Sequence, residues 1–130
     1  MNAQDIMSRP VVAAAPTATA RDVAIYMLLG GFSGVPITER DGRVVGIVTE
    51  LDLMRAVRAG KTLETTTVSE IMSDSVIAVD VRASVEEVMD VLDSERILRV
   101  PVMKDGKMVG VVSRPDVLRA LIETQFIRFD

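Results

Sequence analysis

The segment from Asp41 to Asp52 has the sequence DGRVVGIVTELD, and the segment from Asp105 to Asp116 repeats it as DGKMVGVVSRPD. Further out, Ile6-Met7-Ser8 returns as Ile71-Met72-Ser73, and Gly34-Val35-Pro36-Ile37 returns as Arg99-Val100-Pro101-Val102. Matching segments in the same order indicate two copies of one unit. We therefore divide the chain into a first repeat at residues 1–58, a linker at 59–69, a second repeat at 70–122 and a C-terminal tail at 123–130.

Each copy predicts the order strand, helix, strand, strand, helix, and hence a mixed α/β (α+β) fold. Residues 11–14 and 76–79 are short apolar stretches typical of brief strands. Thr19 and Ser84 are typical helix N-caps, and the apolar residues after Ser84 recur at the spacing of one buried helix face. In each copy an Asp-Gly turn then joins two strands into a hairpin. One copy alone would leave its apolar face exposed, so we expect the two pseudo-symmetric repeats to pack through their sheets.

The composition of the chain excludes several classes of protein. Its 130 residues include no histidine and no cysteine, which removes Ser-His-Asp and Cys-His nucleophiles, zinc sites built from Cys and His, and disulfides. A net charge of −4 and an aromatic content of 3% argue against binding to nucleic acid or to an anionic membrane. The chain shows no signal peptide and no run of about 18 apolar residues, so we expect a cytoplasmic protein without membrane association.

The repeated ending Gly-x-x-Thr/Ser-x-x-Asp places a hydroxyl and a carboxylate where a strand gives way to a helix. One interpretation is structural: Thr49 and Ser113 cap the helix, while Asp52 and Asp116 complement its dipole. The other is functional: free N–H groups and the hydroxyl hold a phosphate, and the carboxylate accepts hydrogen bonds from paired ribose hydroxyls. The recurrence of the motif in both copies favours the functional interpretation.

These features together resemble a tandem pair of CBS (cystathionine beta-synthase type) domains, a Bateman module. The resemblance rests on the Ile-Met-Ser opening, the Gly-Val-Pro-Ile and Arg-Val-Pro-Val turns, the Asp-Gly hairpins and the two Gly-x-x-Thr/Ser-x-x-Asp endings, and it covers nearly the whole chain. It implies that adenosine-containing ligands, namely AMP, ADP, ATP or S-adenosylmethionine, bind as regulatory ligands in clefts between the repeats. It implies no required cofactor.

The resemblance also implies which residues line the two clefts. One ligand site combines Val111, Ser113 and Asp116 with Val11, Val12, Phe32 and Ser33, and the other combines Ile47, Thr49 and Asp52 with Val76, Ile77, Leu98 and Arg99. The Asp side chains would hold ribose, the Thr and Ser hydroxyls phosphate, and the apolar residues adenine. Arg99 stands where the first repeat has Gly34, so the site of Asp52 is expected to prefer phosphorylated ligands, unless Arg99 is an ordinary surface arginine.

The leading hypothesis is a stand-alone regulatory module, not an enzyme, in which ligand binding changes the packing of the repeats and a protein regulated in trans responds. The alternative is a structural dimerisation or interaction module without bound nucleotide. The resemblance favours a homodimer, with an interface on the helix faces beside Leu28, Leu29, Leu92 and Leu121. A third hypothesis is an enzyme that uses Asp52 and Asp116 as acid and base, but neither has an evident nucleophile or metal partner.

Four acidic residues of the second repeat are a candidate metal site: Glu86, Glu87, Asp90 and Asp93. Because they lie along one predicted helix that also carries an apolar face, we interpret them as its solvated face. We therefore predict neither catalytic residues nor metal ligands in this chain.

Overall fold

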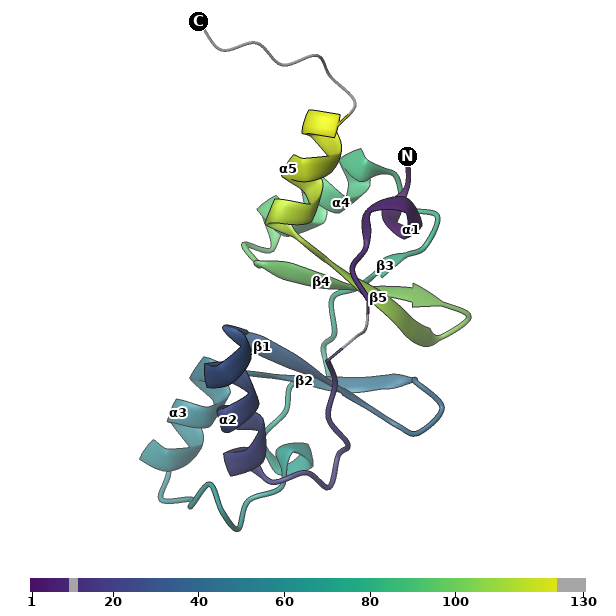
Figure 1. Ribbon diagram of the computed structural model, residues 1–130. Coiled ribbons are helices and arrows are strands. Elements are labelled where there is room, and N and C mark those ends of the chain that lie inside the picture. The colour runs from purple at the N-terminus through teal and green to yellow at the C-terminus, as the bar shows by residue number, and fades with distance from the viewer. Residues whose placement is uncertain (10–11, 124–130) are drawn as a thin grey trace, which may run out of the picture. The chain divides into compact units, whose positions relative to one another are not determined.

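The structure is a computed structural model that describes residues 1–9 and 12–123 of the chain (Figure 1). The described residues form two compact units. Unit 1 consists of the residues up to Arg9 together with Ile77–Glu123, and unit 2 consists of Val12–Val76. Val11 and the predicted tail beyond Glu123 lie outside the described residues.

Unit 2 is an antiparallel hairpin covered by two helices. Its elements are α2 (Ala20–Gly30), β1 (Gly34–Thr38), β2 (Val44–Thr49), α3 (Glu50–Arg58) and the short 3-10 helix η1 (Val68–Glu70). Thr19 caps α2 by accepting the N–H of Asp22 at 3.1 Å, and Gly31 ends the helix in the left-handed conformation with a φ of 68°. The predicted N-cap of this helix is thereby confirmed.

The core of unit 2 lies between the hairpin and its helices. Val23 and Met27 of α2 are buried there against Ile37 of β1 and Val48 of β2. In Figure 1, α2 and α3 lie on the same side of the β1–β2 hairpin. The register of the hairpin places Gly34 opposite Thr49, so the start of β1 lies beside the start of α3.

Unit 1 has the same arrangement with one more strand and a short N-terminal helix. Its elements are α1 (Ala3–Ile6), β3 (Val79–Asp80), α4 (Val85–Ser94), β4 (Arg99–Lys104), β5 (Lys107–Ser113) and α5 (Arg114–Glu123). The sheet order is β3-β4-β5, with β3 parallel and β5 antiparallel to β4. Ser84 caps α4 by accepting the N–H of Glu87 at 3.1 Å, as the sequence predicts.

The predicted order of strand, helix, strand, strand, helix is confirmed in the second repeat, but its first strand is Val79–Asp80 and not the predicted 76–79. The first repeat departs from it, because its predicted first strand at 11–14 is reduced, in the described residues, to a single bridge in which Ala14 lies parallel to Ile37. The N–H of Ala14 donates to the carbonyl of Pro36 at 3.0 Å, and its carbonyl accepts the N–H of Thr38 at 2.9 Å. Two hydrogen bonds at one residue make a bridge and not a ladder.

The opening segment of each repeat packs in a compact unit with the main part of the other repeat. Ser8, from the opening of the first repeat, forms an antiparallel bridge with Val111 in β5 of unit 1. Ser73, from the opening of the second repeat, forms the same bridge with Ile47 in β2 of unit 2. The compact units therefore do not follow the boundaries of the sequence repeats.

The exposed faces of helices α2 and α4 differ in polarity. On α2, Leu28 and Leu29 are each 83% exposed. Leu92 of α4 is buried because it continues the apolar face of Val85 and Val88, so the expectation of an exposed face beside Leu92 is wrong. The exposed residues of α4 include the predicted solvated acids, Glu86, Glu87, Asp90 and Asp93. Among the helices of the described part, none is long and apolar enough to cross a membrane.

Candidate functional site

The two Gly-x-x-Thr/Ser-x-x-Asp motifs lie at equivalent places, where β2 leads into α3 and β5 leads into α5. In unit 2, the Oγ1 of Thr49 accepts the N–H of Asp52 at 3.3 Å, and the Oδ2 of Asp52 accepts the N–H of Thr49 at 2.8 Å. In unit 1, Ser113 and Asp116 form the same reciprocal pair, at 3.3 and 2.9 Å. Both motifs are capping boxes, so the structural interpretation is confirmed. A ligand role requires that the carboxylate also have free acceptor capacity.

The glycine that begins each motif allows the opening segment to approach the strand closely. A Cβ at Gly110 would collide with the side chain of Met7. A Cβ at Gly46 would collide with the side chain of Met72 and would lie 2.9 Å from the carbonyl oxygen of Ser73. These glycines are therefore required by packing, whatever ligand the motif holds.

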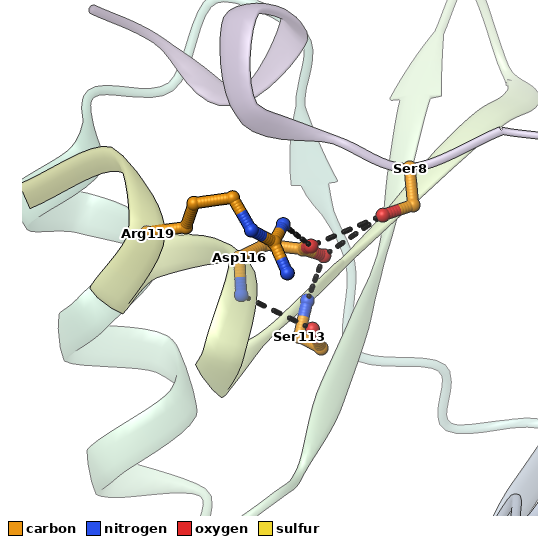
Figure 2. Close-up of polar contacts among 4 residues, drawn as sticks. All are labelled: Ser8, Ser113, Asp116 and Arg119. Carbon is orange, nitrogen blue, oxygen red and sulfur yellow. Dashed lines mark hydrogen bonds and ion pairs between the residues drawn. The ribbon is translucent and has the colours of Figure 1, made fainter. Parts of the chain in front are cut away.

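The carboxylate of Asp116 is surrounded by partners from unit 1 (Figure 2). Besides the N–H of Ser113, it accepts the hydroxyl of Ser8, which lies 3.1 Å from Oδ1 and 3.2 Å from Oδ2. The guanidinium of Arg119 donates to Oδ1 at 3.1 Å. Ser8 is 108 residues away in the chain, so this contact forms only when the opening segment is docked. Neither Ser8 nor Arg119 is among the ligand residues predicted from the sequence.

These partners set the acidity of Asp116, which is only 6% exposed. Burial by itself raises the pKa of a carboxyl group, because it penalises the charged form. The N–H and the hydroxyl of Ser113 lower the pKa, and Arg119 and then Ser8 lower it further. The hydrogen bonds outweigh the burial, so the pKa of Asp116 lies below its ordinary value and the side chain is an anion at neutral pH.

Asp52 has the same capping partner but fewer other contacts. Its Oδ2 accepts the N–H and the hydroxyl of Thr49, at 2.8 and 3.0 Å. Within the described part of the chain, no hydrogen bond reaches Oδ1 and no ion pair joins Asp52 to Arg55, the counterpart of Arg119. Asp52 is partly buried, whereas Asp116 is buried. One oxygen of Asp52 therefore accepts no hydrogen bond from the described residues and keeps its acceptor capacity.

Some of the other predicted ligand residues lie beside these motifs. In unit 2, the carbonyl of Ser33 accepts the N–H of Glu50 at 3.1 Å. In unit 1, the carbonyl of Leu98 accepts the N–H of Arg114 at 3.2 Å. Ser33 precedes β1 and Leu98 precedes β4. In each unit, the turn before the first hairpin strand thus contacts the first residue of the helix that follows the motif.

The remaining predicted residues are spread over strands and connecting segments. Ile47 lies in β2, Val111 in β5 and Arg99 at the start of β4, whereas Val12, Phe32, Val76 and Ile77 lie in connecting segments. The two predicted sets of ligand residues each draw on both units, and these combinations stay predictions. Across the described residues, no group of three or more acidic side chains is placed to hold a metal ion.

Comparison of the chain with models of known protein families finds one family matched twice, in agreement with the duplicated motif. A family model of the CBS domain matches residues 3–59 and, a second time, residues 68–123. The chain belongs to the CBS domain family. The resemblance seen in the sequence is thereby confirmed, and the chain is a pair of CBS domains.

Similar CBS proteins cover almost the full length of the chain. Hypoxic response protein 1 of Mycobacterium tuberculosis (strain H37Rv) is 32% identical over 128 residues, which are 98% of this chain and 90% of that protein. A crystal structure of Hypoxic Response Protein I with two coordinated zinc ions has a TM-score of 0.81 and 31% identity, covering 92% of this chain and 98% of the other. The CBS domain pair of protein MJ0100, in complex with 5′-methylthioadenosine and S-adenosyl-L-methionine, has a TM-score of 0.78 and 27% identity, covering 96% and 98%.

The structure of Hypoxic Response Protein I contains two zinc ions. Zinc in proteins is held mainly by cysteine thiolates and histidine nitrogens, with carboxylates as further ligands. This chain has no cysteine and no histidine. The described residues also hold no cluster of three or more acidic side chains that would replace them.

Proposed function

We propose that this CBS pair is a regulatory module that binds an adenosine-containing ligand: AMP, ADP, ATP or S-adenosylmethionine. The observation that carries the proposal is the carboxylate of Asp52, which lies at the start of α3 with Oδ1 open to an outside donor. A ribose presents two neighbouring hydroxyl donors, and an ionised carboxylate is the acceptor best suited to them. The complex of the MJ0100 pair with two adenosine-containing molecules supports this ligand class.

The rest of the motif is suited to the other parts of such a ligand. The hydroxyls of Thr49 and Ser113 would turn from their capping contacts to a phosphate, because the first N–H groups of both helices already have acceptors in the chain. The apolar residues predicted beside the motifs are suited to the adenine ring. The family indicates no catalytic activity, so the proposed role of these groups is binding. Ligand binding then favours one conformation of the pair, and a partner protein responds to that change.

A thermal-shift screen tests this function. The protein is heated with AMP, ATP or S-adenosylmethionine at millimolar concentration, and GMP is the matched control. A ligand present at about 100 times its Kd stabilises the folded state by about 2.7 kcal/mol, which raises the unfolding midpoint by several degrees. We expect at least one adenosine compound to give this shift and GMP to give a smaller one. No shift with any adenosine compound would overturn the proposal.

Calorimetry on an Asp52 variant tests whether Asp52 binds the ribose of the ligand. Asp52→Ala removes the charged acceptor for ribose, and a hydrogen bond to a charged group is worth about 1.5–3 kcal/mol. The affinity for the best ligand of the screen should therefore fall by about tenfold or more. Unchanged affinity would refute the assignment of ribose to Asp52.

A second function, dimerisation without bound nucleotide, is favoured by the outer face of α2. Tyr26, Leu28 and Leu29 are 62%, 83% and 83% exposed, and large apolar side chains gathered on one helix are typical of protein contacts. Light scattering after size exclusion distinguishes the two functions when combined with the thermal screen. A stable dimer that shows no thermal shift would favour this second function over ligand binding.

A further inference from the structure

We infer that the two CBS units are unequal as ligand sites: the side chain of Ser8 closes the carboxylate of Asp116, while the carboxylate of Asp52 stays open. The inference rests on the proposed function and specifies where the ligand binds first. It assigns to Ser8 the role of an internal donor that competes with ribose hydroxyls for the carboxylate of Asp116.

The opening segments make the same backbone contact in both units. Ser8 and Val111 exchange hydrogen bonds of 2.8 and 3.3 Å, and Ser73 and Ile47 exchange two of 2.9 Å. The side chains then differ. The hydroxyl of Ser8 donates to Asp116, whereas the hydroxyl of Ser73 accepts the N–H of Ser75 at 3.4 Å and has no bond to Asp52 among the described residues.

The acceptor capacity of the two carboxylates differs as a consequence. A carboxylate has about four lone-pair positions. Asp116 already holds three donors: the single hydroxyl of Ser8, which lies between the two oxygens, the N–H of Ser113 at Oδ2 and the guanidinium of Arg119 at Oδ1. On Asp52, the donors from Thr49 both reach Oδ2 and leave Oδ1 without a donor from the described residues. A ribose that donates two hydroxyls exceeds the one position left on Asp116 and must displace a donor, whereas Asp52 has positions for both. Ser8 is the donor on Asp116 that belongs neither to the ion pair nor to the capping box.

Charge reinforces the difference. The guanidinium of Arg119 balances the Asp116 carboxylate at 3.1 Å. No such ion pair is found at Asp52 in the described part of the chain, so ligand hydroxyls meet no competing cation among those residues. Displacement of Ser8 would also remove one of the contacts that hold the opening segment on unit 1. Binding in unit 1 is therefore coupled to the docking of residues 2–8.

Calorimetric titration with AMP tests the inference, with Ser8→Ala as the variant and Ser73→Ala as its matched control. We expect the parent to bind one AMP per chain with the higher affinity, and Asp52→Asn to lose that binding. Ser8→Ala frees acceptor positions on Asp116 and should strengthen the second, weaker binding event by about three- to tenfold, the worth of one hydrogen bond. Ser73→Ala should leave both events unchanged. The double variant Ser8→Ala/Asp52→Asn should bind AMP better than Asp52→Asn alone.

Other outcomes separate the inference from the function on which it rests. Two events of equal affinity in the parent, or no gain in Ser8→Ala, would overturn the inference and leave ligand binding intact. No binding of AMP, ATP or S-adenosylmethionine by the parent and every variant would overturn both.

A titration of the carboxyl carbons by NMR reads the Ser8 contact without any ligand. Loss of the Ser8 donor should raise the pKa of Asp116 in Ser8→Ala, and Ser73→Ala should leave that pKa where the parent has it. An Asp116 pKa that is the same in Ser8→Ala as in the parent would overturn the inference even if AMP binds.

Discussion

Both CBS units have a serine in the opening segment and an arginine three residues after the motif carboxylate, and yet the contacts of the two carboxylates differ. Ser8 and Arg119 both reach Asp116, while their counterparts Ser73 and Arg55 make no bond to Asp52 among the described residues. The backbone of the opening segment is paired alike in both units. Backbone pairing thus follows the repeated sequence, whereas side-chain contacts at the motif depend on local packing, and a pseudo-symmetric pair gains two different sites.

The largest expected effect compares the cores of the two units. Ile37 in unit 2 and its counterpart Val102 in unit 1 are both fully buried. Ile37→Ala should lower the free energy of unfolding by about 2–5 kcal/mol, and Val102→Ala by less because a smaller cavity remains. Urea unfolding followed by circular dichroism measures both. A larger loss in Val102→Ala would show that unit 1, rather than side-chain volume, limits the stability of the pair.

The next comparison concerns the glycines under the opening segments. Gly46→Ala brings a Cβ against the backbone carbonyl of Ser73 as well as the side chain of Met72, whereas the three atoms nearest to a Cβ at Gly110 all belong to the side chain of Met7. A flexible methionine moves more easily than a backbone. Gly46→Ala should cost about 1–3 kcal/mol and Gly110→Ala less, in the same urea experiment. Equal costs would indicate that the two opening segments are held equally firmly.

Replacing the two motif carboxylates should give a smaller difference in the free energy of unfolding at neutral pH. Asp116→Asn weakens charge-assisted bonds to three partners and should cost about 1–3 kcal/mol. Asp52→Asn weakens contacts to Thr49 alone and should cost about 1 kcal/mol or less. Urea midpoints at pH 7 compare them. If Asp52→Asn were the more destabilising variant, Asp116 would not be the more strongly held carboxylate.

The smallest effect is a difference in acid sensitivity. Because the pKa of Asp116 is lowered in the folded state, the unfolded chain takes up this proton first as the pH falls. The stabilisation is complete above the ordinary pKa of about 3.9 and is lost as the pH falls through the lower folded value. Below about pH 4, the parent should therefore lose stability more steeply than Asp116→Asn, measured by urea unfolding between pH 7 and 2.5. Parallel curves would contradict the lowered pKa.

The backbone of both units could be predicted from the sequence because the signals are local. The caps at Thr19 and Ser84, the left-handed Gly31 and the two capping boxes depend on residues within a few positions of one another. The predicted strand at 11–14 failed because one bridge to β1 replaces a ladder, and pairing with a distant strand is not a local property.

The candidate site could be predicted only in part, for the same reason. The motif pairs Thr49 with Asp52 and Ser113 with Asp116 at a spacing visible in the sequence. The contact of Ser8 with Asp116 joins residues 108 positions apart, and Ser73 carries the same side chain without the same contact. Because positions 8 and 73 are both serine, the sequence could not show that only Ser8 bonds to the motif carboxylate.

A crystal structure of the protein with AMP tests the central claim most directly. We predict that the ribose hydroxyls lie within hydrogen-bonding distance of Oδ1 of Asp52, with the Ser8 hydroxyl still on Asp116. AMP held by Asp116 while Asp52 stays empty, or crystals at millimolar AMP that contain no nucleotide, would contradict the account.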